Sequence, residues 1–110
     1  MTRYGRVIKV KPEKLEEYRA LHDNIWAGIV EKLHKAGIEN FTIFYRDGYL
    51  FNYFEYIGND YESDMKELAE DEENIRWLMH TDPCQEPIDT AQNGEWWANM
   101  ENIFHLKDIS

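Results

Sequence analysis

The sequence predicts an α+β fold of the ferredoxin-like β-α-β-β-α-β type, and three observations support this prediction. Short runs rich in β-forming residues occur near both ends of the chain and as a pair in its middle. The central pair is separated by Asp47-Gly48, a strong sign of a two-residue hairpin turn. Two longer stretches with helical periodicity lie between the strands, at residues 12–36 and 60–80.

The first strand is expected over residues 3–11, where apolar and polar side chains alternate. Pro12 ends this strand, and proline is favoured in the first turn of a helix because its missing N–H would have no partner there. The first helix is then predicted to continue without a break to about Ala36, with Gly37 as its C-cap.

The second half of the chain completes the pattern. Two strands flank the central turn, an acidic helical stretch follows in one or two pieces, and a proline-containing loop leads to a last strand. A loop of this length in a small domain is often functional. The predicted ranges are strands at 39–46 and 49–57, helix at 60–80, loop at 81–95 and a last strand at about 101–107.

Composition limits the function classes. A chain of 110 residues fits one domain, residues 1–110, and its net charge of −10 argues against nucleic acid or an anionic membrane as a partner. The only cysteine, Cys84, cannot form an intrachain disulfide, which is compatible with a reducing cytoplasm. No apolar run approaches the ~18 residues of a membrane span, and the N-terminus lacks the apolar core of a signal peptide. We therefore expect a cytoplasmic protein.

The predicted sheet has apolar side chains on both faces. In the second predicted strand Phe41 and Phe44 point to opposite sides, and in the third Phe51 and Phe54 do the same. Helices on one side of the sheet cover only one of these faces. The second apolar face predicts a homodimer that packs sheet against sheet.

The first helix carries a polar pair on its inward face. Tyr18 and His22 lie four residues apart, and both can carry or exchange a proton. Taken alone, such a histidine is more often a structural residue with its hydrogen bonds satisfied. The other members of this stripe are apolar at helical spacing: Leu15, Ile25, Trp26, Ile29 and Leu33.

The remaining chemical side chains give no sign of a metal site. His34, His80 and His105 show no metal-ligand spacing with one another or with Cys84, so we expect no metal. Trp96 and Trp97 would point to opposite faces of an extended segment. At most one of the two is therefore expected to enter a pocket.

Several stretches together resemble the L-rhamnose mutarotase family. The first is the helical element in which Tyr18 and His22 are followed by Ile25 and Trp26. The others follow in order and at similar spacing, so that the resemblance covers nearly the whole chain: residues 37–44, residues 50–56, Trp77 with Thr81 and Asp82, and residues 103–106.

The resemblance implies a dimeric α/β barrel on the ferredoxin-like plan. It also implies a cofactor-free enzyme, an isomerase that interconverts the α and β anomers of the monosaccharide L-rhamnose. The family's catalytic histidine and tyrosine match His22 and Tyr18 of this chain. The residues expected to bind the sugar are Phe41, Trp77, Trp26 and Arg76.

Two positions depart from the family pattern. Phe41 stands where tyrosine is usual, so it cannot donate a hydrogen bond to a sugar hydroxyl, and Arg76 stands where the family often has tryptophan. The reaction type is therefore better supported than the sugar, and another 6-deoxy sugar such as L-fucose fits the same reading. The ferredoxin-like fold also hosts small oxygenases, haem-degrading proteins and binding dimers, which fold class alone does not separate from a mutarotase.

Overall fold

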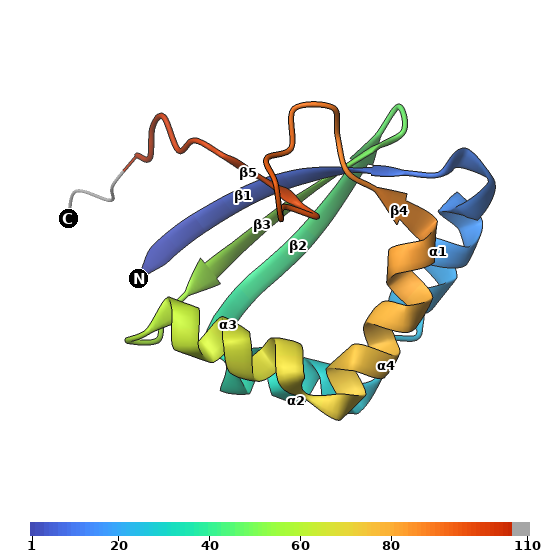
Figure 1. The fold of residues 1–110 in the computed structure, drawn as a ribbon. Helices are drawn as coiled ribbons and strands as arrows, with labels where there is room; N and C mark the ends of the chain where they lie inside the picture. The colour runs from blue at the N-terminus through green and yellow to red at the C-terminus, as the bar shows by residue number, and fades with distance from the viewer. Residues whose placement is uncertain (107–110) are drawn as a thin grey trace.

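The computed structural model describes residues 1–106, which form a curled antiparallel sheet with four helices on one side (Figure 1). The strands are β1 (Thr2–Val10), β2 (Ile38–Arg46), β3 (Tyr49–Tyr56), β4 (Gln85–Glu86) and β5 (Ala98–Met100). The helices are α1 (Leu15–Asp23), α2 (Ala27–Lys35), α3 (Tyr61–Glu70) and α4 (Glu72–Thr81), with short 3₁₀ turns at Pro12–Lys14 and Asp82–Cys84.

The strand order β2-β3-β1-β4 confirms the predicted ferredoxin-like class. β1 pairs along its whole length with β3 on one side, and its other edge receives both β4 and β5. β4 pairs with Lys9 and Val10, whereas β5 pairs with residues 5–7. The strand beyond β1 is thus in two short pieces, and residues 87–97 loop out between them.

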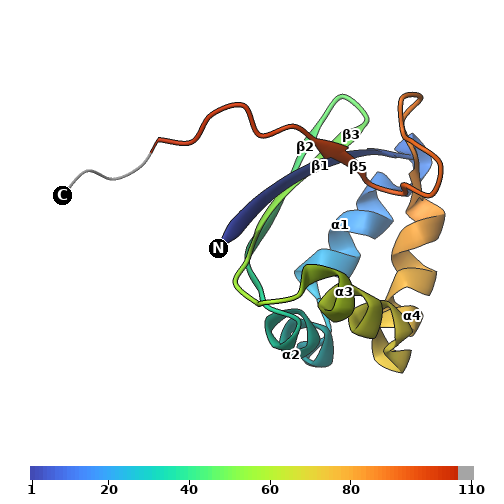
Figure 2. The same ribbon diagram turned by 60° about the vertical axis from the view of Figure 1, so that its left-hand side comes forward.

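The predicted last strand at 101–107 is wrong for the residues that the structure describes. The strand at this end is β5, residues 98–100, whereas residues 101–106 form no strand and run away from the body of the molecule (Figures 1 and 2). Lys107 lies outside the described residues. The side chains of Ile103, Phe104 and Leu106 are 75–89% exposed, so they pack little against their own chain.

The prediction of one unbroken helix over residues 12–36 is also wrong. After the 3₁₀ turn, the helix ends at Asp23 and restarts at Ala27. The Asn24 side-chain amide donates to the carbonyl of Ala20 at 2.9 Å, in competition with helical backbone bonding, and Trp26 has extended backbone angles. The break lets α2 turn and pack against α4, while α1 lies beside α4 (Figure 2).

The acidic stretch at 60–80 consists of two helices, each with an aspartate cap. The carboxylate of Asp60 accepts from the backbone N–H of Ser63 at 3.1 Å to start α3. The carboxylate of Asp71 accepts from the backbone N–H of Asn74 at 3.0 Å to start α4. Aspartate is favoured at this position because it satisfies N–H groups that have no partner within the helix.

The core lies where β1 and β3 meet α1. Its buried members are Ile8, Val10, Tyr18, Leu50 and Cys84. Ile8 and Leu50 are opposite one another across the β1–β3 pair, and Tyr18 packs on them from α1. Among the described residues, no helix is long and apolar enough to cross a membrane.

The central hairpin has the turn that its sequence predicts. Asp47 and Gly48 both have positive φ angles, of 49° and 87°, and Arg46 pairs with Tyr49 on either side of them. Positive φ at both central residues matches the right-handed twist of the two strands. Glycine adopts this conformation without the steric cost that a Cβ atom brings.

Replacing Gly48 with alanine is expected to destabilise the protein by about 1–2 kcal/mol through the left-handed conformation alone. A Cβ at this position would meet no atom within 4 Å, so the loss is conformational and not a clash. Gly48→Asn is the matched control, because asparagine tolerates positive φ, and it should lose less. Chemical denaturation measures both variants, and equal stability of Gly48→Ala and the wild type would contradict the assignment.

Candidate functional site

A cavity of about 370 Å³ lies between the helices and the concave side of the sheet. This volume is in the range of small-molecule sites in proteins, roughly 300–1,000 Å³. Its walls come from β1, β2 and β3, from all four helices and from the connection that follows α4. The residues that the sequence singled out and that line it are Tyr18, His22, Phe41, Trp77 and both Trp96 and Trp97.

His22 is held in one tautomer by α1 itself. Its Nδ1 lies 2.9 Å from the backbone carbonyl oxygen of Tyr18. A carbonyl oxygen can only accept, so Nδ1 carries the proton and donates it. In the neutral ring Nε2 then has a free lone pair. His22 therefore offers a proton-accepting nitrogen at a partly buried position on the cavity wall.

Tyr18 lies beside this imidazole, with ring centroids 4.4 Å apart, and is only 5% exposed. Its hydroxyl accepts a hydrogen bond from the side-chain amide of Gln85 at 3.1 Å. Burial raises the pKa of Tyr18 well above its ordinary value, because a phenolate would lose its hydration. Tyr18 therefore keeps its proton at neutral pH and can donate it to a bound ligand.

Aromatic rings form much of the remaining wall. Trp77 on α4 is 6% exposed and meets His22 edge-on, with centroids 5.4 Å apart. Phe41 on β2 stacks on Phe54 at 5.9 Å and contributes to the opposite side. Tyr18, His22 and Phe41 also line a neighbouring hollow of about 430 Å³ between α1 and β2. Tyr18 and His22 are thus bordered by flat apolar surfaces.

The structure does not bring the other two predicted sugar-binding residues to the cavity lining. Trp26 packs edge-on against Trp77 at 5.3 Å and against His80 at 5.6 Å, so it supports Trp77 from behind. Arg76 is exposed on α4. It directly precedes Trp77 and so projects about 100° around the helix from it, away from the cavity.

The expectation that at most one of Trp96 and Trp97 enters the pocket is wrong, because both line the cavity. The expectation assumed an extended segment, whereas the chain bends at these two residues. Trp96 donates from its indole nitrogen to the side-chain oxygen of Gln85 at 2.9 Å. Trp97 lies under the guanidinium of Arg6, 5.7 Å from its ring centroid.

Five polar residues of the cavity are absent from the predicted site residues: Arg6, Asn74, Thr81, Asp82 and Gln85. Arg6 shares the inward face of β1 with Ile8, so the period-two alternation of the strand was a usable sign for it. Its guanidinium also covers Phe54 at 4.9 Å. Burial raises the pKa of Asp82. Gln85 had no sign in the sequence, because it meets Tyr18 from 67 residues away.

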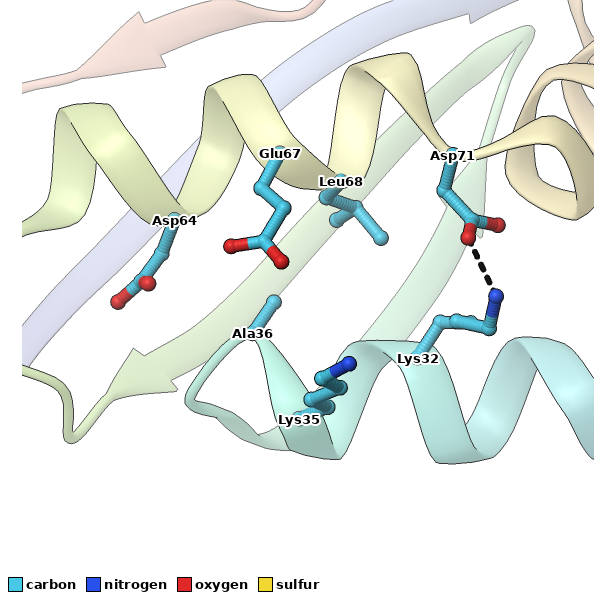
Figure 3. Close-up of a pocket in the computed structure, with 7 residues that line it drawn as sticks. All are labelled: Lys32, Lys35, Ala36, Asp64, Glu67, Leu68 and Asp71. Atoms are coloured by element: carbon cyan, nitrogen blue, oxygen red, sulfur yellow. Dashed lines mark hydrogen bonds and ion pairs between the residues drawn. The ribbon is translucent and has the colours of Figure 1, made fainter.

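A separate groove of about 70 Å³ lies between α2 and α3 (Figure 3). Lys32 of α2 forms an ion pair with Asp71, the residue that caps α4, while Glu67 and Asp64 face the same groove from α3. The groove is small and has none of the predicted catalytic residues, so it is a contact between helices. Within residues 1–106, no group of three or more His, Cys, Asp or Glu side chains could hold a metal ion.

A model of the L-rhamnose mutarotase family matches residues 3–106 of the chain. The chain belongs to the L-rhamnose mutarotase family. L-rhamnose mutarotases from Oceanobacillus iheyensis and Bacillus subtilis are 30% and 31% identical to it. The first alignment covers 96% of this chain and 99% of its relative, and the second covers 91% and 77%.

Solved structures show the same fold at lower identity. The L-rhamnose mutarotase of Formosa agariphila aligns with a TM-score of 0.77 at 18% identity, covering 97% of this chain and all of the other. The tetracenomycin F2 cyclase of Streptomyces glaucescens, a type-II polyketide cyclase, aligns with a TM-score of 0.74 at 14% identity, covering 99% and 100%. These likenesses support the fold class, since the fold is shared by a mutarotase and a cyclase.

Family membership places this mutarotase-like chain among the carbohydrate isomerases, because the L-rhamnose mutarotases interconvert rhamnose anomers. The alternative reading as a monooxygenase of the same fold is not favoured. The comparisons match the prediction from the sequence in both fold and family.

The groove of Figure 3 yields a prediction for pH-dependent stability. The hydrogen bond from Lys32, followed by that from the backbone of Asn74, lowers the pKa of Asp71. Because the pKa of Asp71 is lower in the folded protein than its ordinary value near 3.8, its carboxylate stabilises the fold at pH values above 3.8. This stabilisation is lost as the pH falls through the lowered pKa. Asp71→Asn keeps the cap and loses the charge, so its Tm should be a few degrees below wild type at neutral pH.

That difference in Tm should shrink as the pH falls below about 4, because the wild-type carboxylate then becomes neutral as well. Thermal unfolding followed by circular dichroism from neutral to acid pH measures it. The control is Glu70→Gln, which makes the same charge change at an exposed residue of α3 outside the groove. A constant difference across this range would show that the ion pair contributes nothing.

Proposed function

We propose that this protein interconverts the α and β anomers of L-rhamnose, or of a closely related 6-deoxy sugar, with His22 and Tyr18 as its catalytic pair. The observation that supports the proposal most directly is their juxtaposition. A histidine with a free Nε2 and a protonated phenol lie side by side on the wall of one cavity of sufficient size. Family membership supplies the reaction that needs such a pair.

Mutarotation requires two proton transfers at neighbouring oxygens. A base removes the proton of the anomeric hydroxyl, an acid protonates the ring oxygen, and the bond between the anomeric carbon and the ring oxygen breaks to give the open aldehyde. Rotation about the next carbon–carbon bond presents the other carbonyl face, and the reverse transfers close the ring. The sequence of steps is balanced in protons and electrons and consumes no cofactor.

His22 and Tyr18 can supply both transfers. Nε2 of His22 is free to accept a proton, and the hydroxyl of Tyr18 keeps the proton that can be donated. A positioned acid or base contributes typically about 10²–10⁴-fold to such a reaction. This is sufficient here, because the uncatalysed ring opening in water is already measurable.

The apolar wall suits a deoxy sugar. The faces of Trp77 and Phe41 can contact the C–H bonds of the ring and a C6 methyl group, which need no hydrogen-bond partner. Arg6 and Asp82 on the same wall can bind hydroxyl groups. Because Phe41 has no hydroxyl, it cannot form a hydrogen bond that would select one sugar by its hydroxyl groups. The proposed substrates therefore include L-fucose.

His22→Ala is expected to lower catalysed anomer exchange by about 10²–10⁴-fold, and Tyr18→Phe by a smaller but clear factor. Saturation-difference NMR measures the exchange directly with L-rhamnose, L-fucose, L-lyxose and D-sugars. The matched control is His34→Ala, which removes an exposed histidine of α2. Full activity in the His22 variant would refute the assignment, and no exchange of any sugar by the wild type would refute the function.

We also propose a homodimer that packs through the convex face of the sheet, in the cytoplasm, where the free buried thiol of Cys84 stays reduced. Phe44, Tyr49 and Met100 lie on this face and are 40–62% exposed. The apolar tail continues from its edge, and residues 2–4 of β1 have no partner among the described strands on that side. A second copy would cover both.

The dimer predicts a solution mass of twice 13.3 kDa. Phe44→Glu puts a charge on the covered face and should shift the protein toward monomer, because a buried unpaired carboxylate is costly. Ile75→Glu is the control, since Ile75 is 44% exposed on α4 and outside this face. Sedimentation equilibrium measures the mass. A monomeric wild type at micromolar concentration would contradict the proposal.

A further inference from the structure

Gln85 and Trp96 form a hydrogen-bonded chain that ends on Tyr18. The indole nitrogen of Trp96 lies 2.9 Å from Oε1 of Gln85, and Nε2 of Gln85 lies 3.1 Å from the hydroxyl oxygen of Tyr18. Gln85 is 3% exposed and Tyr18 is 5% exposed, so water has little access to the bond between them, whereas Trp96 is 40% exposed. The chain links the loop between β4 and β5 to helix α1.

The direction of both bonds follows from chemistry. An indole N–H can only donate, so the side-chain oxygen of Gln85 must be the atom that faces Trp96. The amide NH₂ group then faces Tyr18, and an amide nitrogen can only donate. The hydroxyl oxygen of Tyr18 therefore accepts, and its own proton is left to point elsewhere.

We propose that Gln85 and Trp96 are positioning residues which fix the hydroxyl of Tyr18 as an acceptor on its Gln85 side and as a donor toward the cavity. The inference rests on the proposed function and adds the roles of the two catalytic groups. Tyr18 donates to the ring oxygen, and Nε2 of His22 takes the proton of the anomeric hydroxyl. Ring closure on the other face returns both protons.

The same bond from Gln85 stabilises the transition state. As Tyr18 gives up its proton, negative charge develops on its oxygen in a buried site. An N–H donor already aimed at that oxygen offsets the charge without further reorganisation. The burial that raises the pKa of Tyr18 is consistent with this arrangement, because it keeps the proton in place until a ligand oxygen accepts it.

The loop that carries Trp96 is itself held in place. The carboxylate of Glu95 accepts from the backbone N–H of Gln92 at 2.9 Å and from that of Asn99 at 3.2 Å. β4 and β5 anchor the two ends of the loop on β1. The indole is therefore presented from a fixed segment, as a positioning role requires.

The decisive variant is Gln85→Glu. When protonated, the new carboxyl group accepts from Trp96 and donates to Tyr18, as glutamine does. When ionised, the carboxylate can only accept, so the Tyr18 hydroxyl donates its hydrogen bond to the carboxylate and no longer to the ligand. The ratio of variant to wild-type exchange rate should be near one at low pH and should fall at least about tenfold as pH rises through the titration of the new group.

Burial raises the pKa of this introduced carboxyl group, so the fall should occur nearer neutrality than for an exposed glutamate. The charged groups that line the cavity around it are Arg6 and Asp82, with His22 across the wall. These groups are present in both the wild type and the Gln85→Glu variant. Most of the effect of their own titration therefore cancels in the ratio of the two exchange rates. A ratio that is independent of pH from about 5 to 9 would overturn the proposal.

Two controls separate positioning from structure. Gln92→Glu makes the same chemical change at the chain's other glutamine, which is exposed, and should leave the ratio near one at every pH. In a Tyr18→Phe background, Gln85→Glu should lose its pH-dependent effect, because no hydroxyl proton remains to be captured. Persistence of the effect in that background would also overturn the proposal.

Two further measurements cover the case in which Gln85→Glu does not fold or the wild type exchanges no sugar. Trp96→Phe keeps the ring and removes the N–H, so the amide can turn over, and exchange should fall roughly three- to tenfold at unchanged Tm. In protein labelled with ¹³C at tyrosine Cζ, Gln85→Met should shift the Tyr18 Cζ resonance at neutral pH, because the hydroxyl oxygen loses its donor. An unmoved Tyr18 resonance refutes the hydrogen bond whatever the activity.

Discussion

The burial of the Tyr18 ring is the constraint on which the geometry of this protein depends. The ring packs against Ile8 and Leu50 of the sheet, and this contact fixes the rotation of α1 about its own axis. His22 lies one helical turn later on the same face, so the contact that completes the core also sets the imidazole on the cavity wall. A rotation of α1 by one residue, about 100°, would remove both groups from the cavity together.

The sequence predicted the parts of the fold that depend on local patterns. The Asp47-Gly48 turn, the strands beside it and the acidic helical stretch at 60–80 each follow from a few neighbouring residues. The break after Asp23 was not predictable in this way, because apolar periodicity continues through it and only packing against α4 shows where α2 must go. Residues 101–106 have the composition of a strand and lack a strand partner among the residues that the structure describes.

The candidate site was predictable where periodicity decides which way a side chain points. Tyr18, His22 and Trp77 lie on inward helix faces and reach the cavity as expected. Trp26 lies on the inward face of the helix that was predicted over residues 12–36. The interruption of this helix after Asp23 places Trp26 behind Trp77 and not beside it. Gln85 was not predictable, since a glutamine within the predicted loop at 81–95 has no distinguishing pattern and its role exists only through contacts with distant residues.

The strand beside β1 is divided into β4 and β5, and this division separates a connection that can vary in length from a sheet whose register cannot. Each piece is held on β1 by its own backbone pairing, so the length of the connection between them can change without shifting the register of the sheet. Lengthening such a loop costs little, since each doubling adds only about 0.6 kcal/mol of closure entropy. Residues 87–91 of this connection can therefore change while Trp96, Trp97 and the base of the cavity, formed by the sheet and α1, stay the same. A scaffold arranged in this way can alter the loop beside its cavity without moving Tyr18 or His22.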